Sequence, residues 1–147
     1  MFKVHKKIIY AIEAVVDIAL NSGPDPIQNE SIARRQGIPK RYLEQTLQIL
    51  VKNKILVGSR GPKGGYSLAK ERRRIKIADI IKSVSNEDSL INTFNSELSK
   101  KIVLPLITDI SYKCLEKFNN ISIEEVCKIA KTKKLKKDIS KKVDFAI

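Results

Sequence analysis

The residues best suited to chemistry lie along one face of a predicted helix over residues 40–52. Leu43, Leu47 and Leu50 recur at the three-to-four-residue spacing of a buried helix face. The outward face carries long polar side chains, namely Lys40, Arg41, Glu44, Gln45, Gln48 and Lys52. Gln can hydrogen-bond adenine and Glu can accept from cytosine, while Lys and Arg neutralise phosphates. This face is therefore suited to reading a groove of a nucleic acid.

A glycine-rich hairpin tip supplies a second candidate contact. The stretches 55–60 and 66–68 contain residues that favour strands, and the segment between them is rich in glycine. Glycines let a backbone come close to a phosphate or enter a narrow groove, where a larger side chain would collide. The pattern is typical of a wing. Its candidate contact residues are Arg60, Lys63, Gly64 and Gly65.

Three helices are expected to position these two features. Apolar residues spaced by three or four predict a first helix over 8–21. A second, shorter helix is expected over 29–36. Gly37 is suited to end the second helix, and Pro39 is suited to the first turn of the third. Two helices joined by a glycine turn form a helix-turn-helix.

The first domain is expected to close soon after the hairpin. A further helix over 77–85 completes a winged helix-turn-helix domain of residues 1–85. The segment 70–76, between the hairpin and this helix, is the densest basic run of the chain. Two interpretations of it stay open, a solvated loop and a phosphate-binding segment.

A long apolar helix is predicted over 98–118, after a linker of residues 86–97. One small domain can hardly bury so wide an apolar face. We therefore interpret this element as a dimerisation helix, and the alternative is that it lies back over the winged domain. Pro105 requires either that the helix begins near Leu104 or that it is kinked.

The remainder of the chain is expected to hold one more helix. Ser122 and Glu125 have the spacing of a capping box, which starts a short helix through Ala130. Residues 98–130 thus form the second structural unit, and residues 131–147 a basic, mobile tail. The expected fold class is mainly α with a small β-hairpin, combining a winged helix-turn-helix domain with a C-terminal dimerisation helix.

Charge supports a polyanionic partner. Lys and Arg total 29 against 16 for Asp and Glu, and the formal net charge is +13. Residues 1–83 carry +10, residues 84–130 carry −2 and residues 131–147 carry +5. The first part and the tail are therefore suited to phosphate, whereas the middle is suited to packing. A basic surface that serves solubility alone is the alternative.

Other classes of protein find little support in the sequence. Cys114 and Cys127 form no CxxC pair and His5 lies far upstream, so no zinc-ligand spacing can be assembled. Neither Cys has a base nearby in sequence, and we expect no catalytic residues. No apolar run is long enough to span a membrane, and the N-terminus lacks a signal-peptide pattern. We expect a cytoplasmic protein without a membrane partner.

Several short motifs stand in unbroken order over residues 1–84. The most specific are Tyr42-Leu43-Glu44-Gln45 in the third predicted helix and Arg60-Gly61-Pro62-Lys63-Gly64-Gly65-Tyr66 in the wing. Others are Tyr10-Ala11, Asp17-Ile18-Ala19-Leu20, Ile32-Ala33 and Ile77-Ala78-Asp79-Ile80-Ile81. With these motifs the sequence resembles the Rrf-two-type family of bacterial winged-helix transcription regulators.

The resemblance implies a homodimer on double-stranded DNA, with the third helix in the major groove and the wing in an adjacent minor groove. It nominates as DNA-facing Arg41, Tyr42, Glu44, Gln45, Arg60, Lys63 and Gly65. Lys6 and Lys7 would contact phosphates, although Ile8 and Ile9 stand where the family usually has Gly and a basic residue. The aromatic ring of Tyr42 could equally fill the core.

The resemblance also bears on cofactors. Cluster-binding members of the family place three cysteines and often a fourth ligand in a stretch that corresponds to residues 86–97, which here hold no Cys and no His. We expect no cofactor, and Cys114 and Cys127 as buried free thiols, with a redox-sensing pair as the alternative. The expected function is sequence-specific transcription regulation, as a repressor, with a small molecule, a thiol state or a partner protein as signal. The alternative is a non-specific nucleoid or RNA-associated protein.

Overall fold

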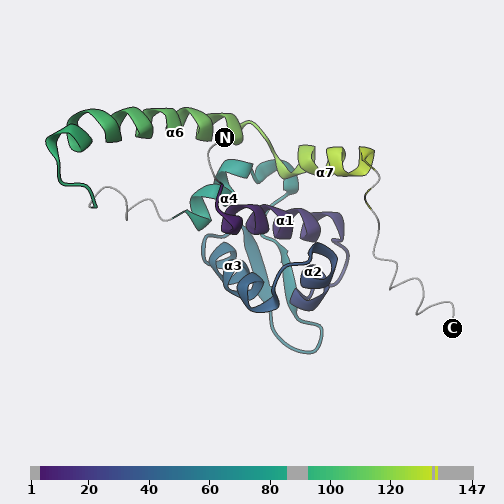
Figure 1. Ribbon diagram of the computed structural model, residues 1–147. Coiled ribbons are helices and arrows are strands. Elements are labelled where there is room, and N and C mark those ends of the chain that lie inside the picture. Colours follow the sequence, from purple (N-terminus) through teal and green to yellow (C-terminus); the bar gives the residue numbers. More distant parts are fainter. Residues whose placement is uncertain (1–3, 86–92, 134, 136–147) are drawn as a thin grey trace.

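The computed structural model describes residues 4–85, 93–133 and 135 (Figure 1). The elements of the first part are α1 (Lys6–Leu20), α2 (Asn29–Gln36), α3 (Lys40–Lys52), β1 (Leu56–Ser59), β2 (Gly65–Leu68), the 3-10 turn η1 (Arg72–Arg74) and α4 (Ile77–Val84). The second part holds the π-helical turn η2 (Ser99–Val103), α6 (Leu104–Asn119) and α7 (Ile123–Thr132). The expected linker of 86–97 is described only from residue 93. Of the expected tail, 131–147, only residues 131–133 and 135 are described, and the first two belong to α7, so the start of the tail is corrected to helix.

The helix-turn-helix forms as its sequence predicts. Gly37 adopts a left-handed conformation with φ 64°, which ends α2, and the amide of Ile38 donates to the carbonyl of Ala33. Pro39 precedes the first residue of α3, and Leu43, Leu47 and Leu50 are fully buried. The apolar spacing therefore identified the buried face of α3 correctly, and the winged-helix fold class is confirmed.

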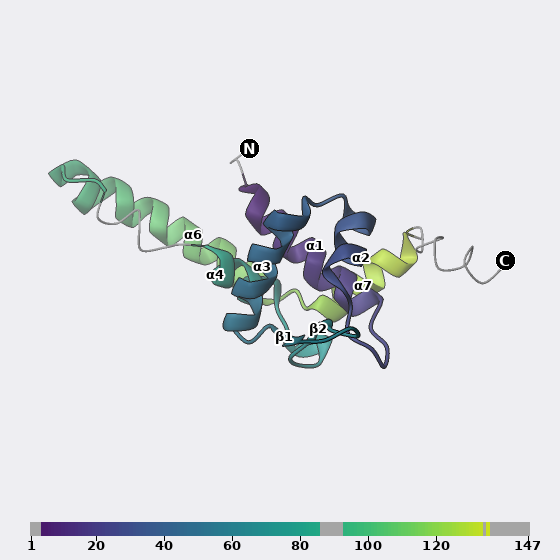
Figure 2. The same ribbon diagram turned by 90° about the horizontal axis from the view of Figure 1, so that it is seen from below.

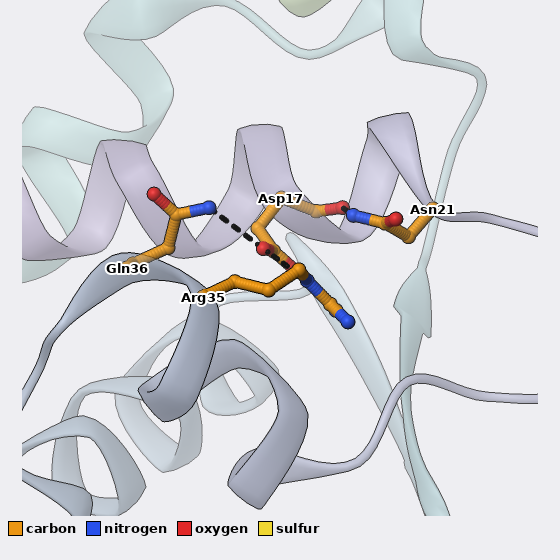
Figure 3. Close-up of polar contacts among 4 residues, drawn as sticks. All are labelled: Asp17, Asn21, Arg35 and Gln36. Carbon is orange, nitrogen blue, oxygen red and sulfur yellow. Dashed lines mark hydrogen bonds and ion pairs between the residues drawn. The ribbon is translucent and has the colours of Figure 1, made fainter. Parts of the chain in front are cut away.

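Helix α1 lies at the centre of the domain and contacts α2, α3, α4 and α7. Its buried face includes one carboxylate, Asp17, which is 1% exposed. The side chain of Arg35 donates to Asp17 from Nε at 2.9 Å and from Nη2 at 2.8 Å, and Nε2 of Gln36 adds a third bond at 2.8 Å (Figure 3). This buried ion pair fixes the C-terminal end of α2 to α1.

The two-stranded hairpin gains a third, one-residue strand that the sequence did not predict. Strands β1 and β2 pair antiparallel, with Leu56 opposite Leu68 and Ser59 opposite Gly65. On the other edge of β2, the amides of Ile27 and Tyr66 each donate to the carbonyl of the other residue at 2.8 Å. The segment that precedes α2 is thus bound to the base of the wing.

The C-terminal helix resolves the alternatives that Pro105 left open. One turn of π-helix runs directly into α6 with helical backbone angles at Val103 and Leu104, and Pro105 is the second residue of α6. The C-terminal end of α6 lies beside α4, and its N-terminal end projects away from the winged domain (Figures 1 and 2). It does not lie back over that domain, and most of its apolar side chains are exposed.

Helix α7 packs on the winged domain rather than on α6. Ile123 and Cys127 are buried in the same core as α1. The hydroxyl of Ser122 accepts from the amide of Glu125 at 3.2 Å, as the capping pattern predicts. Backbone bonds from Ile123 to Ile75 and from Ile77 to Ile121 tie this segment to the start of α4. The helix ends at Thr132, two residues later than expected.

We predict that Asp17→Asn lowers the free energy of unfolding by about 3 kcal/mol, because it removes the buried negative charge that the Arg35 guanidinium contacts at 2.8 Å. Urea denaturation measures the loss. Asp109→Asn is the matched control, since Asp109 forms an exposed pair with Lys113 at 2.9 Å and its replacement is expected to cost less than about 0.5 kcal/mol. Equal losses in the two variants would contradict the role assigned to Asp17.

Candidate nucleic-acid interface

The outward face of α3 is free of contacts that would bury it. Arg41, Glu44, Gln45 and Gln48 are all exposed, and they alternate with the buried leucines that hold the helix to α1. No hydrogen bond restrains the Gln45 side chain among the described residues. These long side chains can therefore rotate to meet a ligand without breaking contacts within the fold.

Tyr42 lies at the edge of this face and does not fill the core. Its side chain is 37% exposed, and its ring meets that of Tyr10 edge to face at a centroid distance of 5.4 Å. Tyr10 follows Lys6 and Lys7 by one turn of α1, so this contact brings the start of α1 near the start of α3. Lys6 is exposed and Lys7 is half-buried.

The wing depends on two glycines that hold the backbone in close contact. A Cβ atom at Gly65 would lie 2.5 Å from the carbonyl oxygen of Ile27, and one at Gly64 would lie 2.5 Å from that of Ser59. The Gly65 φ angle of 155° is also one that side-chain-bearing residues rarely adopt. Beyond these residues Arg60 and Lys63 are exposed at the tip.

An open groove separates the wing from the helix-turn-helix. Its lining comes from the start of α2, from α3 and from the wing, and consists of Gln28, Asn29, Glu30, Lys40, Gln48, Val51, Gly58, Ser59, Arg60, Gly61, Gly64, Gly65 and Tyr66. Nε2 of Gln28 donates to the carbonyl of Pro62 across this groove at 3.4 Å. Oδ1 of Asn29 is buried with no hydrogen-bond partner among the residues that the structure describes.

Electrostatic effects connect the groove to the two elements that flank it. Burial raises the pKa of the Tyr66 phenol, and the negative charge of Glu44 raises it further, so Glu44 lies close enough to the base of the wing to affect it. At the other side, a hydrogen bond from Lys40 and its positive charge lower the pKa of Glu30. Nζ of Lys40 donates to Oε1 of Glu30 at 2.5 Å.

The structure brings together part of the residue set that the sequence nominated. Lys40, Gln48, Arg60, Gly64 and Gly65 line the groove. The other nominated residues lie outside it, on the exposed face of α3, at the wing tip and at the start of α1; they are Arg41, Tyr42, Glu44, Gln45, Lys63, Lys6 and Lys7. The basic run 70–76 does not join the groove lining.

Sequence reasoning missed the residues that open α2. Gln28, Asn29 and Glu30 line the groove at the start of α2, and Gln28 also contacts the wing. A signal for them was present, because polar side chains at the first turn of a predicted helix lie beside unpaired backbone N–H groups that attract anions.

Arg72 belongs to the basic run 70–76 and faces α7, where its Nε lies 3.4 Å from Oε2 of Glu124.

Comparison with known proteins identifies the family. The sequence profile of Rrf2, described as an iron-dependent transcriptional regulator, matches residues 4–129. The chain belongs to the Rrf2 family. The resemblance seen in the sequence motifs is thereby confirmed, and it extends through α6 and most of α7.

Two relatives of this Rrf2-family chain are the transcriptional regulators IscR of Xenorhabdus nematophila and of Cronobacter sakazakii. The first is 33% identical over 123 residues, which cover 81% of this chain and 75% of the relative. The second is 43% identical over 75 residues, which cover 51% of this chain but only 46% of the relative. The strongest identity is thus confined to about half of each protein.

A solved structure shows the same fold. The IscR of T. potens superposes with a TM-score of 0.73 at 29% sequence identity, covering 95% of this chain and 96% of the other. The match includes α6 and α7 as well as the winged domain, because nearly the whole chain is covered.

No helix among the described residues is both long and apolar enough to cross a membrane.

The thiol and imidazole groups of the chain do not fit an iron–sulfur cluster, although the family description includes iron. Cys127 is buried in the core, whereas Cys114 is exposed on another helix, which corrects the expectation that both are buried. Residues 86–97 hold no Cys and no His. Cluster ligation needs several such ligands together. Across the described ranges, no group of three His, Cys, Asp or Glu side chains could hold a metal ion.

We predict that Gly65→Ala detaches the wing from Ile27, because the new Cβ would collide with a backbone oxygen rather than with a flexible side chain. We expect a loss of about 2 kcal/mol in urea denaturation and faster hydrogen exchange at the amides of Ile27 and Tyr66. In Gly23→Ala, the control, no atom lies within 4 Å of the added Cβ, and both quantities should remain near those of the unchanged chain. Unaltered exchange in the Gly65 variant would contradict the account.

Proposed function

We propose that the chain is a sequence-specific DNA-binding transcription regulator, with a repressor as the expected type. The observation that carries the proposal is the joint placement of the α3 face and the glycine-rich wing on either side of one open groove. The helix has the dimensions that a major groove admits, and the wing tip carries Arg60 and Lys63 beside glycines that a minor groove can accommodate. Family membership supports the same function.

The decisive experiment is selection of DNA from a random pool by the purified protein. A transcription regulator should enrich one sequence and bind it about 1,000-fold or more tighter than random duplex at physiological salt. A palindromic sequence would support a dimer on two half-sites. Equal affinity for all duplexes, with RNA competing equally, would instead support the non-specific nucleoid or RNA-associated protein and overturn the proposal.

The helix and the wing are expected to contribute differently. Gln45→Ala should reduce discrimination between selected and random duplex more than it reduces affinity for random duplex, because an amide can read a base edge. Lys63→Ala should weaken binding to both duplexes and reduce the salt slope by about one unit, because a lysine neutralises a phosphate. Fluorescence anisotropy at several salt concentrations measures both effects. Equal losses on both duplexes for both variants would contradict this division.

We propose further that two chains associate through α6. Leu106 and Ile110 are 60% and 50% exposed, and Ile102, Val103 and Ile107 extend the same apolar face. A face of this kind on a helix that extends away from its own domain is suited to packing against a second copy. The half-site geometry of winged helix-turn-helix dimers supports the same arrangement.

The double variant Leu106→Asp with Ile110→Asp is expected to convert the dimer to a monomer, because charge on the paired face would be desolvated. Sedimentation velocity measures the mass. Thr108→Asp adds charge at an exposed position away from these two side chains and should leave the dimer intact. A double variant that sediments as the unchanged chain does would show that α6 is not the dimer interface.

We infer that the regulator senses its signal without an iron–sulfur cluster, since the chain lacks a suitable ligand set. Anaerobically purified protein is expected to show no visible absorption band of a cluster. Iron and sulfide analyses should give far less than one equivalent per chain. A brown protein with stoichiometric iron and sulfide would overturn this inference, while leaving the proposed DNA binding untouched.

A further inference from the structure

An ion pair bridges the two helices of the helix-turn-helix inside the proposed DNA site. Glu30 is the second residue of α2, Lys40 is the first residue of α3, and their side chains are joined through Oε1 and Nζ. Both residues line the groove that faces the wing. Lys40, one of the residues expected to face DNA, is thus paired with an acidic side chain inside this groove.

This pair can exchange partners without cost to the fold. The Lys40 side chain is 59% exposed and the Glu30 side chain 70%, so water already screens their attraction and the pair contributes little to stability. The buried Asp17–Arg35 pair, by contrast, is 0% and 10% exposed and cannot open without loss of structure. The lysine of the exposed pair is therefore available to any anion that competes with Glu30.

We propose that Glu30 acts as an internal competitor of the DNA backbone for Lys40 and thereby selects against loosely bound duplex. The inference rests on the proposed DNA-binding function. In a complex positioned by base contacts, a phosphate reaches the groove and takes Lys40 from Glu30. In a sequence-independent complex no contact fixes the phosphate there, and Lys40 stays with Glu30.

The physical consequence concerns affinity and salt dependence together. Sequence-independent binding derives almost entirely from neutralised phosphates, each of which contributes about 0.9 to the slope of log K against log salt. Lys40 held by Glu30 contributes nothing to that slope. Removing the Glu30 charge should therefore benefit random duplex more than selected duplex, and the specificity ratio should fall.

A double-mutant cycle tests the proposal with Glu30→Gln, Lys40→Gln and the combined variant. On random-sequence duplex, Glu30→Gln is expected to tighten binding by about five-fold and to steepen the salt slope by about 0.9. On the duplex selected from the pool the gain should be smaller. In the Lys40→Gln background the same Glu30 change should give a clearly smaller gain and no steepening.

The matched control is Glu71→Gln, which removes an acidic partner from another exposed pair. Oε2 of Glu71 lies 2.6 Å from Nε of Arg73, with exposures of 64% and 75%, and neither residue lines the groove. This variant reports the effect of net charge alone. Circular dichroism and urea denaturation should show all variants to be folded, because both pairs are exposed.

Three outcomes would overturn the proposal. An unchanged affinity in Glu30→Gln would show that Glu30 does not compete for Lys40. An equal gain with and without Lys40 would show that Glu30 acts by another route, either by direct repulsion of the duplex or through the nearby Arg34. A gain as large in Glu71→Gln would show a general charge effect. Failure of the unchanged chain to bind duplex DNA would instead overturn the proposed function itself, so the two failures are distinguishable.

Discussion

The geometry of the proposed site depends on how α2 is held at its two ends. At its C-terminal end, the buried carboxylate of Asp17 accepts three hydrogen bonds from Arg35 and Gln36 and so attaches α2 to α1. At its N-terminal end, paired backbone bonds join Ile27 to Tyr66 in β2. Helix α3 follows α2 through one glycine turn, and the wing tip follows β1. These two attachments therefore fix the outward face of α3 relative to the wing.

The same frame separates two surfaces with different tasks. The α3 face and wing tip lie on one side of the domain, and α6 extends from the other (Figure 1). Helix α7 connects the two parts, because it follows α6 directly in the chain and buries Ile123 and Cys127 against the core around α1. Helix α6 is also packed on α4, which in turn contacts α1.

Much of this structure could be predicted from local patterns in the sequence. The leucine spacing of α3, the left-handed Gly37 and the glycines of the wing each reflect a constraint within a few residues, so the helices, the turn and the hairpin were predictable. The strand at Ile27 was not, because a single residue shows no alternation. The packing of α7 on the winged domain was not predictable either. The periodicity of a short helix shows which of its faces is buried, but not which element that face packs against.

The residues of the candidate site also divide into those that a local pattern identified and those that depend on how the helices pack. Arg60, Gly64 and Gly65 were identified because a basic residue beside several glycines at a hairpin tip is typical of a wing. Glu30 was missed because its meaning depends on Lys40, which is ten residues later in sequence and adjacent only after α2 and α3 pack. Charge content alone left both interpretations of residues 70–76 open, and the structure adds only that Arg72 faces Glu124 of α7 and that Arg73 pairs with Glu71.

The central claim, that α3 and the wing together bind DNA, is tested most directly by hydrogen exchange of the chain with and without the duplex it selects. We predict slower exchange at the wing and at the starts of α2 and α3, and unchanged exchange in segment 70–76, although it is the densest basic run of the chain. Protection of residues 70–76 with no change in the wing or α3 would contradict it.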